Sequence, residues 1–557
     1  MQQVFEFDDI VLSELALEWG QSETTKGQIY TDPIVIRFIL NLLGDGSEQL
    51  KNKKFLEPSC GEGEFILEIT KRLIRSSHGK PRLVELYGTV TAYDIVSKSI
   101  DIAKKNIGSY LKSEGYKQEE INPLLESWFH HGDFLLSAIT DEFDYVVGNP
   151  PYVRVENIPK PLLREYRARY SSMGNRADLY IPFFEKSLSL LKAGGKLNFI
   201  CTDRWTKNTY GKQLRQIISR AYNLDLFVDL YGGDFFHKKV STYPAITQIS
   251  NRNGKAHQTV VAYNPNLSDK TYQHLRDLID HKNIEPLGNI QIRDDIVCSD
   301  HPWLITADSE INLIRKLEAK FPLLEDVGCK VHIGAATGCN DIFVVKKDQL
   351  DVEPSRLLPV ITAEEVKDNE VQWKERYIIN TYDQNGVIDL EQFPKLLKYL
   401  EAHKERLSNR HVAKKSPKNW FKTIDRVYPE RAATPKLLIP DIKSKPVIIY
   451  DEGLFHPNNS IYYIISKKWD IFALRAVLLS GMSQLFVKAY TTKIANGYFR
   501  FQAQYLRKIR IPEWDAVNKE IKAGLIKAGR ESDFDSCTYY VSLLYELTEA
   551  ETLQIRG

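Results

Sequence analysis

Between about residues 50 and 250, strand-like runs alternate with helix-like segments, and this alternation constrains the fold more than any other feature of the chain. Strand-like runs cover residues 54–57, 89–95, 128–131, 143–148 and 196–200. Such alternation is typical of parallel sheets with helices on both faces. We therefore expect an α/β fold with a doubly wound, mostly parallel sheet. In such a sheet, ligands bind at the carboxyl ends of the strands, near the point where strand order reverses.

The tetrad Asn149-Pro150-Pro151-Tyr152 directly follows the fourth of these runs. Two prolines fix φ and remove two backbone donors, so the strand must stop there. The Asn149 side-chain oxygen and the Pro150 carbonyl then become neighbouring acceptors, with an aromatic ring beside them. That set suits a flat –NH2 group on a planar ring. Taken alone, the tetrad fits a proline-rich turn after a core strand equally well.

A glycine-containing loop follows the first run, and Gly61 and Gly63 would let its backbone approach a ligand at the start of a helix. The spacing lacks the third glycine of a dinucleotide-binding fingerprint. Glu62 and Glu64 would also repel a pyrophosphate. The loop therefore favours a ligand that carries a positive charge and an amino acid group, although an isolated Gly-x-Gly turn is weak evidence.

Acidic residues end the second and third runs. Asp94 is placed to accept from two ribose hydroxyls, and Ile95 could flank an adenine. Asp133 could accept from an adenine amino group while Phe134 stacks on the ring. The alternatives are a helix N-cap at Asp94 and a plain turn at Asp133.

In this order and spacing, the motifs resemble those of S-adenosylmethionine-dependent N6-adenine DNA methyltransferases in the gamma arrangement, the TaqI-like and Eco57I-like group. Residues 27–33 resemble the family's N-terminal cofactor motif, and residues 176–185 the motif that lines the cofactor pocket after the tetrad. Residues 235–241 match the segment whose aromatic side chain stacks on an extruded base. Residues 333–343 and 497–502 resemble the opening and closing portions of the recognition domain.

The resemblance implies a seven-stranded methyltransferase domain over residues 1–255 and an α+β DNA-recognition domain over residues 256–557, ending in a helical segment. It implies S-adenosylmethionine as cofactor and a flipped adenine in duplex DNA as substrate. The implied catalytic residues are Asn149, Pro150, Pro151 and Tyr152, with Tyr152 and Phe235 stacking on the base and Phe236 as the alternative to Phe235. The implied cofactor-binding residues are Tyr30, Thr31, Pro33, Glu57, Pro58, Ser59, Gly61, Gly63, Phe65, Asp94, Ile95, Asp133, Phe134, Asn149, Pro151, Asp178 and Phe183.

Net charge is only +2, so affinity for DNA must come from local patches. Residues 402–446 contain twelve Lys and Arg against four acids, a net +8, interleaved with aromatic residues. A solvated surface is the alternative reading of such a run. The predicted DNA-binding residues are Arg154, Lys238, Lys239, Lys414, Lys415, Lys418, Trp420 and Lys422.

The other sequence features limit the class of protein to which the chain can belong. Six cysteines without a Cys-x-x-Cys pair, and no apolar run near the ~20 residues of a membrane span, favour a cytoplasmic protein. No metal site is expected. Because no complete nuclease motif follows Pro440-Asp441, we expect any cognate restriction endonuclease that recognises the same short DNA sequence to be a separate protein. The remaining alternatives are methylation of a protein glutamine, of an RNA base or of cytosine N4, and a DNA-binding specificity factor without catalysis.

Overall fold

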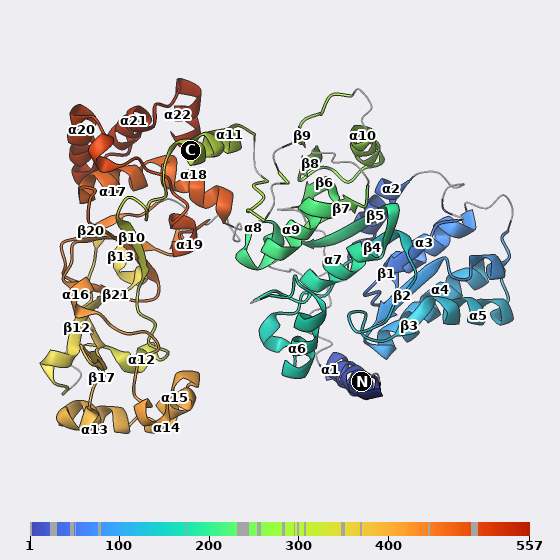
Figure 1. The fold of residues 1–557 in the computed structure, drawn as a ribbon, viewed down its shortest axis with the longest axis horizontal. Helices are drawn as coiled ribbons and strands as arrows, with labels where there is room; N and C mark the ends of the chain where they lie inside the picture. The colour runs from blue at the N-terminus through green and yellow to red at the C-terminus, as the bar shows by residue number, and fades with distance from the viewer. Residues whose placement is uncertain are drawn as a thin grey trace. The chain divides into compact units, whose positions relative to one another are not determined.

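The chain folds into two compact units, Met1–Ile305 and Thr306–Gly557 (Figure 1). The computed structural model describes residues 3–22, 31–44, 50, 52–75, 80–174, 176–230, 244–252, 258–280, 284–294, 296–297, 300–305, 308–346, 351–367, 370–443, 446–491 and 499–556.

The first unit is built on a nine-stranded sheet in the order β3-β2-β1-β4-β5-β7-β6-β8-β9. Its strands are β1 (Phe55–Glu57), β2 (Val90–Asp94), β3 (Phe129–His131), β4 (Phe143–Gly148), β5 (Leu191–Thr202), β6 (Asn223–Asp229), β7 (Pro244–Ser250), β8 (Thr259–Tyr263) and β9 (Ile290–Arg293). Strands β1 to β5 pair in parallel, whereas β7 runs antiparallel to both β5 and β6. The α/β fold with a mostly parallel sheet is confirmed.

Strand order reverses between β1 and β4. From β1 the chain adds β2 and β3 on one side, and then returns to place β4 and β5 on the other. Phe55 and Leu56 of β1 pair with Val90 and Thr91 of β2 on one side, and β1 also pairs with β4 on the other. The carboxyl ends of these strands therefore meet at a topological switch point, where α/β sheets bind their ligands.

Two strands more than the predicted seven belong to this sheet. Strand β8 pairs in parallel with β6, and β9 pairs antiparallel with β8. Val260, Val261 and Ala262 of β8 are buried. The first unit therefore ends at Ile305, and the boundary predicted after residue 255 falls too early because these two short strands belong to the same core.

Side chains of adjacent strand residues alternate between two cores, one on each face of the sheet. Phe55, Tyr145 and Val147 pack in a core with α2, α3, α4 and α5, while Leu56 and Val146 pack in a second core with α1, α6, α7 and α9 (Figure 1). The helices of this unit are α1 (Gln3–Ser22), α2 (Pro33–Leu43), α3 (Glu64–Arg75), α4 (Ser97–Ser113), α5 (Gln118–Trp128), α6 (Lys160–Arg169), α7 (Tyr180–Ser189), α8 (Arg204–Lys207), α9 (Lys212–Ala221) and α10 (Asp269–Ile279).

The second unit contains smaller sheets and a group of C-terminal helices, as expected for an α+β domain. One sheet has the order β10-β22-β18-β20 and another β11-β15-β12-β21. Their strands are β10 (Cys329–Ile333), β22 (Ile461–Ser466), β18 (Lys436–Pro440), β20 (Ile449–Asp451), β11 (Val344–Lys346), β15 (Arg376–Ile379), β12 (Leu357–Ile361) and β21 (His456–Pro457). Short two-stranded pairings join β13 (Val366–Lys367) to β14 (Glu370–Val371), β16 (Tyr382–Asp383) to β17 (Gly386–Val387), and β19 (Ile442–Lys443) to β23 (Phe499–Arg500).

Most of the longer helices of this unit lie at its C-terminal end. The helices are α11 (Asp308–Lys320), α12 (Asn340–Phe343), α13 (Pro394–Glu401), α14 (Lys404–Ser408), α15 (His411–Lys415), α16 (Pro429–Ala432), α17 (Ile471–Leu479), α18 (Gly481–Tyr490), α19 (Ala503–Leu506), α20 (Lys519–Glu531), α21 (Phe534–Tyr545) and α22 (Glu549–Arg556). Within the described ranges no single helix is long and apolar enough to cross a membrane, and the bent pair α17 and α18 passes that test by length and composition only.

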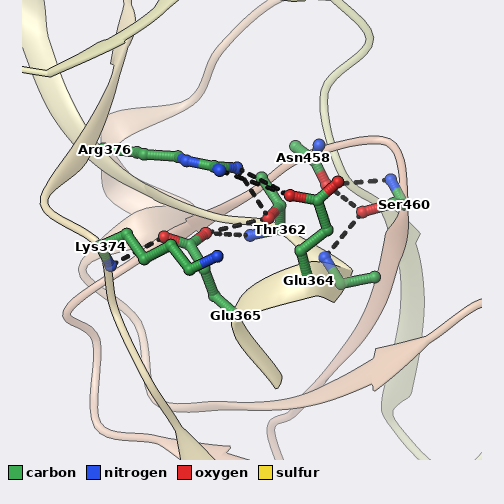
Figure 2. A network of polar contacts seen from close by, with 8 residues as sticks. Thr362, Glu364, Glu365, Lys374, Arg376, Asn458 and Ser460 are labelled. Carbon is green, nitrogen blue, oxygen red and sulfur yellow. Dashed lines mark hydrogen bonds and ion pairs between the residues drawn. The ribbon is translucent and has the colours of Figure 1, made fainter. Parts of the chain in front are cut away.

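A buried polar network joins distant segments of the second unit (Figure 2). The Glu365 carboxylate accepts hydrogen bonds from the backbone N–H and hydroxyl of Thr362 and from the backbone N–H of Lys374, at 2.9–3.0 Å. The Ser460 hydroxyl accepts from the backbone N–H of Ala363 at 2.9 Å. Because these acceptors satisfy backbone donors, the network fixes the loop after β12 against the loop before β22.

Candidate active site

A cavity opens at the carboxyl ends of β1, β2 and β4, where strand order reverses. Its empty space, including the open mouth, is about 1180 Å³. Thirteen of the seventeen predicted cofactor-binding residues line it, namely Thr31, Glu57, Pro58, Ser59, Gly61, Phe65, Asp94, Ile95, Asp133, Phe134, Asn149, Pro151 and Phe183. The fold thus brings together residues that lie more than 150 positions apart in the chain.

The Asp94 carboxylate ties the glycine loop to the end of β2. One oxygen accepts from the backbone N–H of Gly61 and the other from that of Val96, both at 2.8 Å. Val96, not Asp94, is the N-cap position of α4. Burial raises the pKa of Asp94, and the backbone donors act in the opposite direction. Asp94 therefore shapes the loop that forms the cavity floor and also lines the cavity itself.

Asp133 combines the two roles considered for it, because it makes a turn and also lines the cavity. Its carboxylate accepts from the backbone N–H of Leu135 at 2.7 Å and from the hydroxyl of Tyr166 on α6. Burial raises its pKa, whereas these hydrogen bonds and Lys186 lower it.

The cavity is acidic on one side and apolar on the other. Glu57, Glu64 and Asp94 all line it, and burial together with the two neighbouring carboxylates raises the pKa of Glu57 well above its ordinary value. Phe134 and Phe183 lie 5.3 Å apart between ring centroids on the apolar side. A ligand with a cationic end and a flat apolar end would match both sides.

Asn149 of the tetrad lies at the cavity wall next to β1. Its side-chain Nδ2 donates to the Thr31 hydroxyl at 3.1 Å, and its backbone carbonyl accepts from the Ser59 hydroxyl at 3.2 Å. The bond to Thr31 sets the orientation of the amide, and with it the direction of Oδ1.

Tyr152 does not line the cavity. Its ring lies edge-on to that of Tyr180, 6.2 Å away, and its hydroxyl donates to the Ile200 carbonyl at 3.3 Å. Tyr180 is in turn bonded to the hydroxyl of Tyr210 at 3.1 Å. Tyr152 is half-buried in this aromatic cluster, whereas its neighbour Pro151 lines the cavity.

Four other predicted site residues lie away from the cavity. Pro33 is the first residue of α2, and Pro150 is buried. Gly63 has φ +85°, and a Cβ there would lie 2.7 Å from that of Ala103, so it permits close packing of α3 on α4. Burial raises the pKa of Asp178 to about 6, with Arg204 and Arg154 acting in the opposite direction. Tyr30, Phe235, Phe236, Lys238 and Lys239 lie outside the described residues.

Several lining residues were not predicted from the sequence. Trp19 and Gly20 come from α1, and a Cβ on Gly20 would lie 2.7 Å from the Ile95 side chain. Tyr166 comes from α6. The spacing of Leu12, Leu15 and Trp19, which pack against the core, was the one signal that could have assigned α1 to this unit. The other lining residues outside the predicted cofactor-binding set are Ile36, Cys60, Glu64, Val96, Gly132, Leu135, Val153 and Leu179, of which Glu64 belongs to the acidic loop and Leu179 to the segment 176–185 noted in the sequence.

The predicted DNA-binding residues of the second unit differ in exposure. Lys414, Lys415 and Lys418 are exposed, as is Arg154 in the first unit. Trp420 is half-buried against the core around Phe421, with the Lys404 ammonium 5.2 Å from its ring centroid. Lys422 is also half-buried.

Other basic residues of the same stretch serve the fold. Arg410 donates to the carbonyls of Thr337, Trp420 and Lys422 at 2.8–3.0 Å. Lys436 is fully buried and pairs with Asp451 at 2.6 Å. The net charge of residues 402–446 therefore overstates the charge available at the surface.

Two family models match the chain. The Eco57I restriction-modification methylase model matches residues 64–236, and the TaqI-like C-terminal specificity domain model matches residues 358–511. The first match spans the elements from α3 through β6 of the first unit, and the second lies entirely within the second unit.

Relatives extend over nearly the whole chain. The type II methyltransferase M.PaeR7I of Pseudomonas aeruginosa is 42% identical over 98% of this chain and 95% of its own length. The type II methyltransferase M.BstVI of Geobacillus stearothermophilus is 37% identical over 94% of this chain and 97% of its own length. Among solved structures, the DNA complex of the type IIL restriction-modification enzyme MmeI has the same fold at 13% identity, with a TM-score of 0.63 over 94% of this chain and 76% of that one. By these relatives and both family models, the chain belongs to the type II DNA methyltransferases of restriction-modification systems.

Proposed function

We propose that the chain transfers a methyl group from S-adenosylmethionine to N6 of an adenine that is flipped out of duplex DNA at a specific short sequence. One observation carries the proposal. Asn149 and Pro151 line the same cavity as Glu57, Asp94 and Asp133, whereas Tyr152 lies outside it. The tetrad therefore stands between a cavity suited to the cofactor and a separate aromatic cluster.

The cavity residues fit S-adenosylmethionine in charge and shape. The carboxylates of Glu57 and Glu64 suit its sulfonium and ammonium charges, because a bound cation would relieve their mutual repulsion. Asp94 would accept from the ribose hydroxyls. Phe134 and Phe183 would hold the adenine ring, and Asp133 would accept from its amino group. When bound, the cofactor supplies the methyl group on a sulfonium leaving group.

The tetrad would prepare the substrate amine. The lone pair of an exocyclic amine is delocalised into its ring, so the nitrogen is a poor nucleophile while it stays planar. Acceptance of its two hydrogens by Asn149 Oδ1 and the Pro150 carbonyl favours a pyramidal nitrogen, whose lone pair points at the methyl group. The same acceptors stabilise the positive charge that develops on nitrogen.

A base inside the duplex cannot reach this site and must be extruded, at a cost of a few kcal/mol. Stacking on an aromatic side chain offsets roughly 1–3 kcal/mol per ring. Tyr152 would supply one ring and Phe235 the other. The aromatic cluster of Tyr152, Tyr180 and Tyr210 supports this role, because the edge-on contact with Tyr180 and the hydrogen bond from the Tyr152 hydroxyl to the Ile200 carbonyl hold Tyr152 in place.

Sequence specificity would come from the second unit. Its exposed lysines would contact phosphates, which position the protein on the duplex. Lys414 and Lys415 at the end of α15 and Lys418 in the following turn (Pro417–Asn419) form one exposed basic segment. If each contacts a phosphate, binding should weaken steeply with salt. The slope of log K against log salt should become shallower by roughly 0.9 for each contact removed in the variant Lys414→Gln/Lys415→Gln/Lys418→Gln.

Modification-sensitive sequencing of DNA from cells that express the chain tests the function. We expect N6-methyladenine at one short sequence, and none in cells that express the Asn149→Ala variant. Methylation at cytosine N4 would overturn the choice of adenine. Unmodified DNA together with methylated glutamine or RNA would overturn the choice of substrate. A cognate endonuclease, encoded separately, should be blocked by the same modification.

A further inference from the structure

Tyr166 joins α6 to the cofactor cavity through a single polar contact. The residue is buried, lines the cavity, and its hydroxyl donates to the Asp133 carboxylate. Burial and the neighbouring Asp133 raise the pKa of Tyr166 well above its ordinary value, so its hydroxyl keeps its proton and remains the donor. The second fixed donor to this carboxylate is the backbone N–H of Leu135.

The two donors hold the two oxygens of Asp133 separately. Leu135 bonds to Oδ1 at 2.7 Å, and Tyr166 bonds to Oδ2. A carboxylate gripped at both oxygens cannot rotate about its bond to Cβ without losing a hydrogen bond in a buried place. Each oxygen has a second lone pair, so the fixed carboxylate can still accept from a ligand.

The rest of the same loop is held through its backbone. Tyr170, which directly follows α6, donates to the Leu135 carbonyl, and Arg169 at the end of α6 donates to the Leu136 carbonyl at 2.9 Å. From α7, the Lys186 ammonium donates to the Ser137 carbonyl at 2.6 Å and lies 4.6 Å from the Phe134 ring centroid. These contacts fix where the loop lies. Tyr166 alone among these side chains of α6 and α7 bonds to the Asp133 side chain.

We propose that Tyr166 is a positioning residue of the cofactor site, which orients the Asp133 carboxylate to accept from the 6-amino group of the cofactor's adenine. This inference rests on the proposed function. If Tyr166 had a purely structural role, its substitution would weaken the binding of every ligand of the cavity to the same extent. A positioning role acts on one hydrogen bond, and therefore on the discrimination between an amino group and a group that cannot donate.

Two thioether ligands that differ only at position 6 of the purine provide the test. S-adenosylhomocysteine has an amino group there, and its 6-deamino purine analogue has a hydrogen atom that cannot donate to Asp133, while N1 is unchanged. Sites built to hydrogen-bond a ligand group reject analogues that lack it, so calorimetry on the full chain should show the wild type preferring the adenosyl ligand by about tenfold or more. In Tyr166→Phe we expect this preference to fall by about fivefold.

Tyr170→Phe is the matched control, because it removes a hydroxyl four residues further along the chain, just after α6, that bonds to the same loop, but to a backbone carbonyl. Its preference should equal that of the wild type. Thermal unfolding would verify that each variant folds. If Tyr166→Phe does not fold, Tyr166→His is measured in its place, because a shorter ring cannot bridge to Asp133 and should show the same loss of preference.

The outcomes separate this inference from the function on which it rests. A wild type that binds neither ligand overturns both. Equal binding of both ligands by the wild type leaves methyl transfer intact but overturns the role of Asp133 and Tyr166. An unchanged preference in Tyr166→Phe, or an equal loss in Tyr170→Phe, overturns the positioning role alone.

Discussion

The two units use the same types of polar side chain in opposite ways. In the first unit, Asp94 and Asp133 accept backbone hydrogen bonds at strand ends and also line a cavity. In the second unit, Glu365 (Figure 2) and also the pair Lys436–Asp451 are buried among protein donors and acceptors. Asp94 and Asp133 thus shape a place for a ligand, whereas Glu365 and the Lys436–Asp451 pair hold segments of the second unit together.

A charged residue therefore indicates a binding site only where the fold places its side chain at a cavity. In parallel α/β sheets the topology guarantees this at the switch point. In a unit of short antiparallel strands and long loops, buried backbone groups need partners, and charged side chains supply them. Substitution of Asn149 at the cavity should therefore affect methyl transfer, whereas substitution of the buried Lys436 should affect stability.

The largest effect is expected from Lys436→Met. It leaves the Asp451 carboxylate buried without its ion-pair partner, at 2.6 Å from where the ammonium lies, with both side chains at most 1% exposed. Breaking one side of a buried pair costs about 3–5 kcal/mol. Chemical denaturation should show the second unit unfolding at lower denaturant concentration, while binding of S-adenosylhomocysteine at low denaturant is retained.

The double variant Lys436→Met/Asp451→Asn serves as the control for this prediction. The amide that replaces the Asp451 carboxylate would keep an oxygen to accept from the backbone N–H of Gly453 and Leu454, as the carboxylate does, without a buried charge. The double variant should therefore recover part of the lost stability. If it is less stable than Lys436→Met, the buried charge is not the cause.

The next largest effect is expected from Asn149→Ala, and it should fall on catalysis. Removal of one acceptor that stabilises developing charge lowers turnover by about 10²–10³, as for a lost oxyanion-hole donor. Methyl transfer to DNA that contains the recognition sequence would be measured with radiolabelled cofactor. The unfolding midpoint should change little, in contrast to Lys436→Met.

Asn149→Asp distinguishes the effect of losing the acceptor oxygen from the effect of losing the other parts of the side chain. It keeps the acceptor oxygen, but it loses the Nδ2 donor that bonds to Thr31 and adds a charge near Glu57. We expect more residual methyl transfer than in Asn149→Ala, together with a lower free energy of unfolding. Methylation within a few-fold of the wild type in both variants would contradict the assigned role.

Much of the lining of the cavity could be predicted from the sequence, because strand ends that are separated in the chain meet at one edge of a parallel sheet. The loop after β1, Asp94, Asp133 and two residues of the tetrad, Asn149 and Pro151, could therefore be assigned to one cavity from order and spacing. Tyr166 could not, because its spacing from Leu162 marks the buried face of α6 but does not show that its hydroxyl reaches Asp133.

In the second unit the sequence predicted much less. The run of basic residues suggested a DNA-binding surface, yet Arg410 bonds to three carbonyls and Lys436 is buried. Which cations are buried depends on long-range pairing between loops, and that pairing has no periodic signature. The unit boundary failed for a related reason, since β8 and β9 join the sheet after a change of pattern in the sequence.

Gly61 and Gly63 provide a comparison within the first unit, two residues apart. A Cβ on Gly63 would meet Ala103 at 2.7 Å, whereas no atom of the described residues lies within 4 Å of a Cβ on Gly61, which lines the cavity. Gly63→Ala should cost about 2–3 kcal/mol of stability through overpacking and strain at positive φ. Gly61→Ala should cost about 1 kcal/mol, but it should weaken S-adenosylhomocysteine binding more than Gly63→Ala does. Equal effects on both properties would show that both glycines serve the same purpose.

The smallest effect concerns Asp178, which bears charge outside the cavity. Burial raises its pKa from 3.8 to about 6 in the folded chain. Between these values the unfolded chain has lost the proton that the folded chain keeps, so this group's contribution to stability is present below pH 4 and is lost as pH rises through 6. Asp178→Asn should therefore match the wild type near pH 4 and exceed its stability by about 1 kcal/mol above pH 6, because solvent at this half-buried site screens most of the roughly 3 kcal/mol that such a pKa difference would give at a fully buried one. Denaturation of both proteins across this range measures the difference, from which all other titrating groups cancel.

A variant that is less stable than the wild type at pH 7 would mean that the ionised carboxylate is held by Arg154 and Arg204 more strongly than burial opposes it. Asp178 would then resemble the ion-paired residues of the second unit.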